Sequence, residues 1–185
     1  MSLFWKRTGK MLLPVTAGLM MLGTVAFADM NAQTAPAYTG KLFGNIPNVT
    51  VRGIPAGGAP WVVDGSVKLT DNHIWASGKW LMVPKTGYLA DGKPIPMKVA
   101  GTTAGFLKVV AEITFANAKS VVTAPVTLTA KGDFTINAKV MIPKGAADPV
   151  ILIGPPNGMG GEKVWFASTN FLMDYGQAMM GSASN

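Results

Sequence analysis

The chain of 185 residues contains no cysteine, one histidine and few charged residues. Without cysteine it cannot form a disulfide, a zinc–thiolate site, an iron–sulfur cluster or a thiol nucleophile. A single histidine excludes a centre built from several histidines of one chain, and a blue-copper site lacks both its cysteine and its second histidine. Charged residues make up 14% of the sequence, against roughly 25% in an ordinary globular domain. These shortages exclude thiol chemistry and most nitrogen-rich metal centres.

The N-terminal segment has the parts of a secretory signal peptide. Three basic residues precede Met11, and the stretch from Met11 to Phe27 carries no charge. The A-x-A pattern that ends at Ala28 is typical of a cleavage site. We therefore predict a bacterial protein that is exported to the periplasm, to the cell surface or outside the cell. After cleavage it is not expected to span a membrane.

Cleavage after Ala28 would leave 157 residues with a formal net charge of +4, because three of the 16 basic residues lie in the signal peptide. Twelve of the remaining basic residues are lysines, spread evenly along the chain. Nucleic-acid binders concentrate their basic residues and favour arginine, so we do not expect a nucleic-acid partner. The predicted organisation is a signal peptide (1–28), a flexible lead-in (29–45), a β-sandwich domain (46–173) and a flexible tail (174–185).

Several segments alternate apolar and polar residues with a period of two, which is typical of half-buried strands. The clearest example runs from Phe134 to Ile142. Pro125 interrupts a further segment, which predicts an edge strand or two short pieces there. Many glycines and prolines supply turns between the segments. We predict strands at 64–70, 73–83, 107–115, 120–128, 134–142, 150–153 and 164–168.

About eight or nine short strands joined by turns predict an all-β fold, an antiparallel β-sandwich in which each strand has one apolar and one polar face. The sequence Lys131-Gly132-Asp133 is predicted to close a hairpin between residues 126–130 and the strand that begins at Phe134. The segment from Thr127 to Pro143 resembles the strand–turn–strand of many immunoglobulin-like modules. This resemblance implies an immunoglobulin-like or similar sandwich.

Two tryptophans are the strongest candidates for binding. Trp75 and Trp80 lie in one predicted strand, and their odd spacing places them on opposite faces if the strand is regular. An outward tryptophan beside lysines can stack on a sugar ring or anchor a protein partner. The glycine-rich and proline-rich loop from Gly154 to Gly161 is the second candidate, because long loops often carry partner contacts. From this loop we predict contacts by Asn157, Gly158 and Met159.

Methionines and the single histidine offer one route to a metal site. His73, Met82 and Met141 are candidate ligands for Cu(I), which prefers thioether and imidazole donors. Methionine more often fills gaps in a core. Met141 fits that role least, because it falls on the polar side of its strand.

The leading functional hypothesis is a non-enzymatic, exported protein that acts as a binding or structural subunit and needs no cofactor. Its expected partners are proteins or glycans of the cell envelope, and it is also a candidate for self-association. A periplasmic copper-handling protein is the alternative. A hydrolase that uses a pair of carboxylates is the third hypothesis, because nine acidic residues are scattered along the chain.

Overall fold

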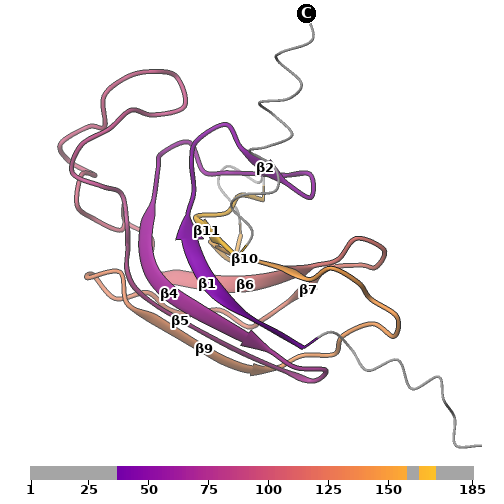
Figure 1. Cartoon of the computed structure of the whole chain (residues 1–185). Coiled ribbons are helices and arrows are strands. Elements are labelled where there is room, and N and C mark those ends of the chain that lie inside the picture. The colour runs from indigo at the N-terminus through magenta and orange to yellow at the C-terminus, as the bar shows by residue number, and fades with distance from the viewer. Residues whose placement is uncertain (1–36, 158–162, 170–185) are drawn as a thin grey trace, which may run out of the picture. The chain divides into compact units, whose positions relative to one another are not determined.

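The computed structural model describes residues 37–157 and 163–169. These residues form strands and turns and no helix, so none of them belongs to a helix that could cross a lipid bilayer. Figure 1 shows the strands side by side in a sheet that curls over on itself. The predicted signal peptide (1–28) and the predicted C-terminal tail (174–185) lie outside the described residues.

Eleven strands follow one another along the described chain. The strands at 62–69, 73–82 and 134–139 alternate more buried and more exposed residues, as the period of two predicts. The strand at 108–114 does not alternate and is buried over most of its length. The strands are β1 (Tyr38–Gly44), β2 (Thr50–Val51), β3 (Ile54–Pro55), β4 (Val62–Leu69), β5 (His73–Met82), β6 (Lys108–Thr114), β7 (Val121–Val122), β8 (Val126–Thr127), β9 (Phe134–Lys139), β10 (Val150–Gly154) and β11 (Ala167–Ser168).

Nine strands form one antiparallel sheet, and β2 and β3 form a separate hairpin. The order in the large sheet is β7-β6-β10-β11-β1-β4-β5-β9, with β8 also paired to β6. β1 joins the two halves, because its first part pairs with β4 while Phe43 and Gly44 pair with β11. β8 pairs with β6 and leads through a short turn into β9, at the other end of the sheet. The chain therefore ties the two ends of the curled sheet together.

The inside of the curl is filled by one apolar core. Ile74 and Ile136 come from one half of the sheet and Ile153 from the other, and all three are fully buried. Aromatic rings close one part of this core, where Trp61 stacks on Phe166 with ring centroids 4.0 Å apart. Each half of the sheet thus buries one face against the other, which stabilises the curl through removal of apolar surface from water.

A second, smaller cluster covers the opposite face of β10. Val150 and Leu152 pack there with Trp165 and with residues of the β2–β3 hairpin. The indole Nε1 of Trp165 donates a hydrogen bond to the carbonyl oxygen of Ile54, with a separation of 3.0 Å. β10 is consequently buried on both faces, which explains why residues 150–153 are continuously apolar and do not alternate.

The described structure differs from the expected domain boundary. Residues 38–44 fall in the range predicted as a flexible lead-in, yet they form β1 inside the sheet. Leu42 of this strand is buried in the core. The β domain therefore includes residues 38–44, ahead of residue 46. The sequence signal was weak because β1 contains two glycines and few large apolar residues.

The segment around Pro125 forms two short strands, β7 and β8, which is one of the two outcomes predicted there. The predicted turn at residues 131–133 is also present, since the amide of Thr129 donates to the carbonyl of Asp133 at 3.0 Å. β8 forms its ladder with β6, however, and not with β9. The all-β class and the antiparallel pairing are confirmed. The finer descriptions, β-sandwich and immunoglobulin-like, stay predictions.

A long connection between β5 and β6 projects beyond the sheet (Figure 1). It is fastened to the core by Ile95, which is buried, while Tyr88 is 69% exposed. Within this connection, Lys93 pairs with Asp91 through Nζ and Oδ2, which are 2.8 Å apart. Hydrogen bonds from the side chain and the backbone of Lys93 hold the pKa of Asp91 below its usual value.

Candidate functional site

The outer face of β5 carries two exposed tryptophans. Ile74 and Ala76 are buried in the core, so Trp75 and Ser77 face outward. The indole of Trp75 is 41% exposed and that of Trp80 is 57% exposed. Large aromatic side chains are usually mostly buried, and two of them at the surface of one strand point to a contact surface.

A β-bulge brings both tryptophans to the outer face. Asp64 of β4 pairs with Lys79, but the next aligned pair is Val62 with Met82, so β5 has one residue more than β4 at this point. Lys79 and Trp80 are therefore both exposed, and Leu81 is fully buried. The expectation that Trp75 and Trp80 lie on opposite faces was wrong, because it assumed a regular strand.

The backbone of Trp80 is in the left-handed region, with φ = 57°. This conformation costs a residue other than glycine about 1–2 kcal/mol, and the corresponding position of many bulges is glycine. The bulge is held by the next residue, since the amide of Leu81 donates to the carbonyl of Gly132 at 2.9 Å. The fold therefore maintains a strained, exposed tryptophan, and strain of this kind is concentrated at functional sites.

Trp75 is held in place by His73 of its own strand, which is bonded to Asn137 of β9, and by Lys68 of β4. The ring of His73 stacks on the indole, with centroids 3.9 Å apart, and His73 Nε2 shares a 2.5 Å hydrogen bond with Asn137 Oδ1. From β4, Lys68 Nζ lies 5.9 Å from the centroid of the indole. These contacts restrict the orientation of the ring before any partner binds, which lowers the entropic cost of binding.

Between the tryptophans, the register aligns polar side chains in rows across the strands. Lys68, Trp75 and Asn137 form one row. The next row consists of Ser66, Ser77 and Thr135. Together with residues beyond it, this row lines a groove of about 500 Å³. Its lining residues are Asp64, Gly65, Ser66, Ser77, Gly78, Lys79, Thr127, Thr129, Asp133, Phe134 and Thr135. We call the groove, the two tryptophans and the flanking residues Lys41, Lys68, Asn137 and Lys139 the Trp75–Trp80 face.

This face is basic. It includes four exposed lysines, whereas the carboxylates that line its groove are those of Asp64 and Asp133. Within residues 37–157 and 163–169, the salt bridges are Lys93 with Asp91 and Lys163 with Glu112. No described carboxylate therefore neutralises these four lysines at salt-bridge distance. The four lysines are Lys41, Lys68, Lys79 and Lys139.

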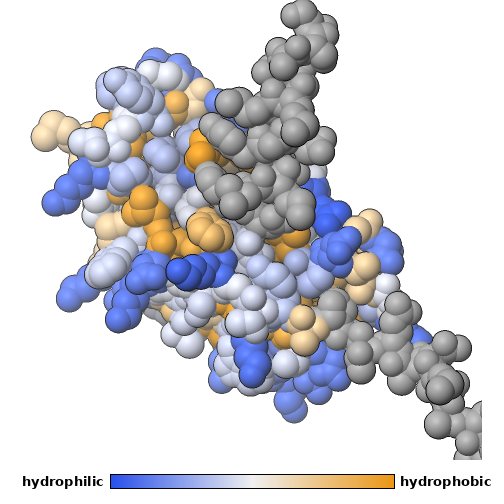
Figure 2. All heavy atoms as spheres, viewed as in Figure 1, coloured by the Kyte–Doolittle hydropathy of each residue, from blue (hydrophilic) through white to orange (hydrophobic). Residues whose placement is uncertain are grey.

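The surface visible in Figure 2 is mixed, with hydrophilic side chains spread over it and hydrophobic residues in small separate areas between them. Stable obligate interfaces are usually larger and more continuously apolar. A mixed surface with isolated aromatic side chains suits a reversible partner better than a permanent subunit contact.

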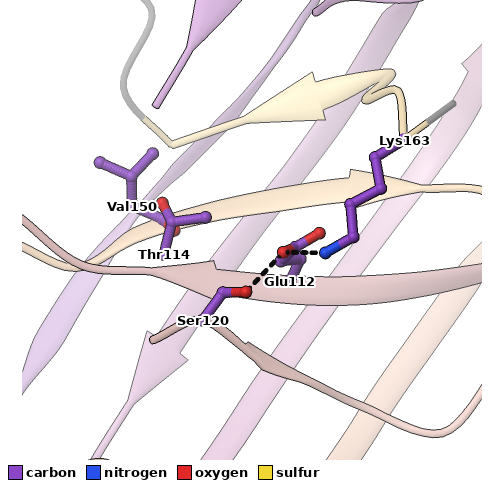
Figure 3. Close-up of polar contacts among 5 residues, drawn as sticks. All are labelled: Glu112, Thr114, Ser120, Val150 and Lys163. Carbon is purple, nitrogen blue, oxygen red and sulfur yellow. Dashed lines mark hydrogen bonds and ion pairs between the residues drawn. The ribbon is translucent and has the colours of Figure 1, made fainter. Parts of the chain in front are cut away.

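Glu112 belongs to a second polar cluster, on the outer side of β6 (Figure 3). Its Oε1 atom accepts hydrogen bonds from Ser120 Oγ and Lys163 Nζ, each at 2.7 Å. The side chain of Glu112 is only 12% exposed, whereas that of Lys163 is 63% exposed. The two donors satisfy this largely buried carboxylate. The cluster therefore fixes Lys163 to β6, and this is a structural role.

The predicted loop contact Asn157 lies at the rim of the same region. It lines a cleft of about 270 Å³ together with Glu112, Lys163 and apolar residues such as Leu152 and Trp165. The other two predicted loop contacts, Gly158 and Met159, lie outside the described residues. Asn157 is therefore remote from Trp75 in the sheet order, on the opposite half of the curled sheet.

The candidate copper ligands are only partly brought together. His73 and Met141 line one surface pocket of about 490 Å³, where Met141 is 86% exposed. Met82 is at the other end of β5 from His73, and a ten-residue strand is about 30 Å long. No group of three or more His, Asp or Glu residues in the described ranges is arranged to hold a metal ion. The three predicted ligands do not form one site.

Fold and site together define a class: an all-β protein with a curled antiparallel sheet and a basic, tryptophan-bearing outer face. Comparison of the chain with models of known protein families, with curated proteins and with solved structures found no match. The function of the protein is therefore inferred from the residues of the Trp75–Trp80 face.

Most residues of the face were not singled out from the sequence, although their alternation was visible. Ser66, Lys68 and Lys79 lie on the polar sides of their strands, as do Thr135 and Asn137. Alternation shows that these residues face outward, but it does not show which strands are neighbours. The order β4-β5-β9 and the register are what place them around one groove.

Proposed function

We propose that the protein is exported and acts as a non-enzymatic binding module for a protein or glycan of the cell envelope. The observation that carries the proposal is the pair of exposed tryptophans on one face, one of them in a strained backbone conformation. The sequence pattern of the first 28 residues supports export. In this proposal the fold is an immunoglobulin-like β-sandwich, which the single core shared by the two halves of the sheet supports.

The binding proposal is tested with the purified protein and washed cell-envelope fractions. We expect the protein to sediment with the envelope, and we expect Trp75→Ala and Trp80→Ala each to weaken this association about tenfold or more, because aromatic anchors dominate contact energies. Tyr88→Ala is the matched control, since Tyr88 is an exposed aromatic residue on the projecting β5–β6 connection.

Two results would contradict this proposal. One is a strictly monomeric protein, by light scattering, that does not associate with the envelope fraction. The other is release of reducing sugars or peptides that stops in Asp64→Asn or Asp133→Asn variants. The latter would favour the carboxylate-pair hydrolase, because these two carboxylates line the same groove.

A further inference from the structure

We propose that the Trp75–Trp80 face binds an acidic polysaccharide, a chain of sugar rings that carries carboxylates. This inference rests on the proposed function and names the ligand class of the same face. The proposed ligand is a glycan, whereas the proposed function allows either a protein or a glycan.

The spacing of the aromatic rings suits an extended chain of sugars. Trp75 and Trp80 are five positions apart along β5, roughly 15 Å in a strand. Sugar rings present an apolar C–H face, which stacks on an indole, and hydroxyl groups around their edges. The face of the Trp75 indole that His73 does not cover and the indole of Trp80 therefore provide two stacking positions for one linear ligand, with the polar groove between them.

The groove offers the hydrogen-bonding groups that sugar hydroxyls need. Ser66, Ser77 and Thr135 lie opposite one another in a single row across β4, β5 and β9. Each hydroxyl can both donate and accept, so it can match a sugar hydroxyl in either role. The exposed amide side chain of Asn137, in the row of Trp75, adds the donors of its Nδ2 group, while its Oδ1 atom is bonded to His73.

The charge of the face selects an acidic glycan. Lys68 Nζ lies over the ring of Trp75, 5.9 Å from its centroid, so a sugar that binds there brings a carboxylate close to a cation. Lys79 immediately precedes Trp80 in the bulge and lines the groove, so the second stacking position also has a lysine next to it in the chain. A neutral glycan offers these lysines hydroxyl oxygens as acceptors but no charged partner. An acidic peptide could pair with the lysines, but it would not use the row of hydroxyls and the stacking rings together.

The experiment compares three probes by titration against the purified full chain. Polygalacturonate supplies sugar rings and carboxylates, dextran supplies sugar rings alone, and poly-glutamate supplies carboxylates alone. We expect polygalacturonate to bind about tenfold or more tightly than either other probe, since it alone engages both the indoles and the lysines. Binding should weaken as salt is raised to about 0.5 M, where charges are screened within a few ångströms.

Variants separate the two contributions. Lys68→Gln and Lys79→Gln should each weaken polygalacturonate binding severalfold and reduce its salt dependence, while Trp75→Ala should weaken it about tenfold. Lys119→Gln removes an exposed lysine outside the face and should leave the Kd unchanged.

Equal affinity for dextran or for poly-glutamate, or no binding of polygalacturonate, would overturn the inference. The proposed function would survive each of these results if envelope association persisted and still depended on Trp75 and Trp80. If the protein bound polygalacturonate as expected but did not associate with the envelope, the proposed function would be contradicted and the inference on the ligand class would stand.

Discussion

Replacement of Gly44 by alanine is expected to destabilise the fold severely. A Cβ at this position would overlap the carbonyl oxygen of Trp61 and lie 2.6 Å from its carbonyl carbon. Both are backbone atoms, so no side-chain rotation relieves the contact. We expect a loss of about 3 kcal/mol or more in the free energy of unfolding, measured by denaturant titration.

The expected loss has a topological reason. Gly44 ends β1, at the point where the strand leaves its ladder with β4 and pairs with β11. Separation of β1 from Trp61 would weaken the link between the two halves of the sheet. Gly58→Ala is the matched control, because a Cβ there meets no atom within 4 Å. Equal stability of the Gly44→Ala and Gly58→Ala proteins would show that the two backbones are not this close.

At Trp80, glycine is expected to be a more stable substitute than alanine. Both substitutions remove the same indole contacts, so the difference between them isolates the backbone. Alanine retains the penalty of the left-handed conformation at φ = 57°, whereas glycine does not. After allowance for the greater freedom of unfolded glycine, we expect Trp80→Gly to exceed Trp80→Ala by about 0.5–1 kcal/mol in the free energy of unfolding.

Trp75 provides the control for this comparison. It lies in a regular part of β5, paired on both sides, where glycine should be less stable than alanine by about 0.5–1 kcal/mol. The order of glycine and alanine is therefore expected to reverse between the two positions. The same order at both would contradict a strained bulge. Both Trp80 variants should also lose envelope association about tenfold or more, since binding depends on the indole.

This combination of results would show that the strained backbone at Trp80 is retained because the indole is needed for binding. Glycine would satisfy the backbone of the bulge, yet the chain has a tryptophan there and exposes more than half of it. Proteins commonly retain less stable residues where activity needs them. If Trp80→Gly is more stable than Trp80→Ala and both variants lose binding equally, the indole is the reason for the strained residue.

The candidate copper ligands show that spacing along the sequence does not determine which residues lie close together in the fold. His73 and Met141 are far apart in the chain but line one pocket, because β5 and β9 are antiparallel neighbours and His73 pairs with Lys139. Met82 is nearer to His73 in sequence, yet the extended strand separates the two residues. Distance along a strand is fixed by its rise per residue, whereas distance across strands depends on the pairing.

The sequence by itself determined the all-β class and the location of most strands. A period of two is local, and it survives any arrangement in which one face of a strand is buried. The shortage of cysteine and histidine likewise excludes several kinds of chemistry, whichever way the strands are arranged. These conclusions depend only on residue type and short-range spacing.

Only the tertiary structure decided which strands are neighbours and where the face lies. The sharing of β1 between two ladders, the pairing of β8 with β6 and the order β4-β5-β9 all depend on contacts between residues distant in sequence. The bulge at Trp80 is also a property of pairing, because an extra residue exists only relative to a partner strand. That extra residue places both tryptophans on one face, whereas a regular period of two would place them on opposite faces.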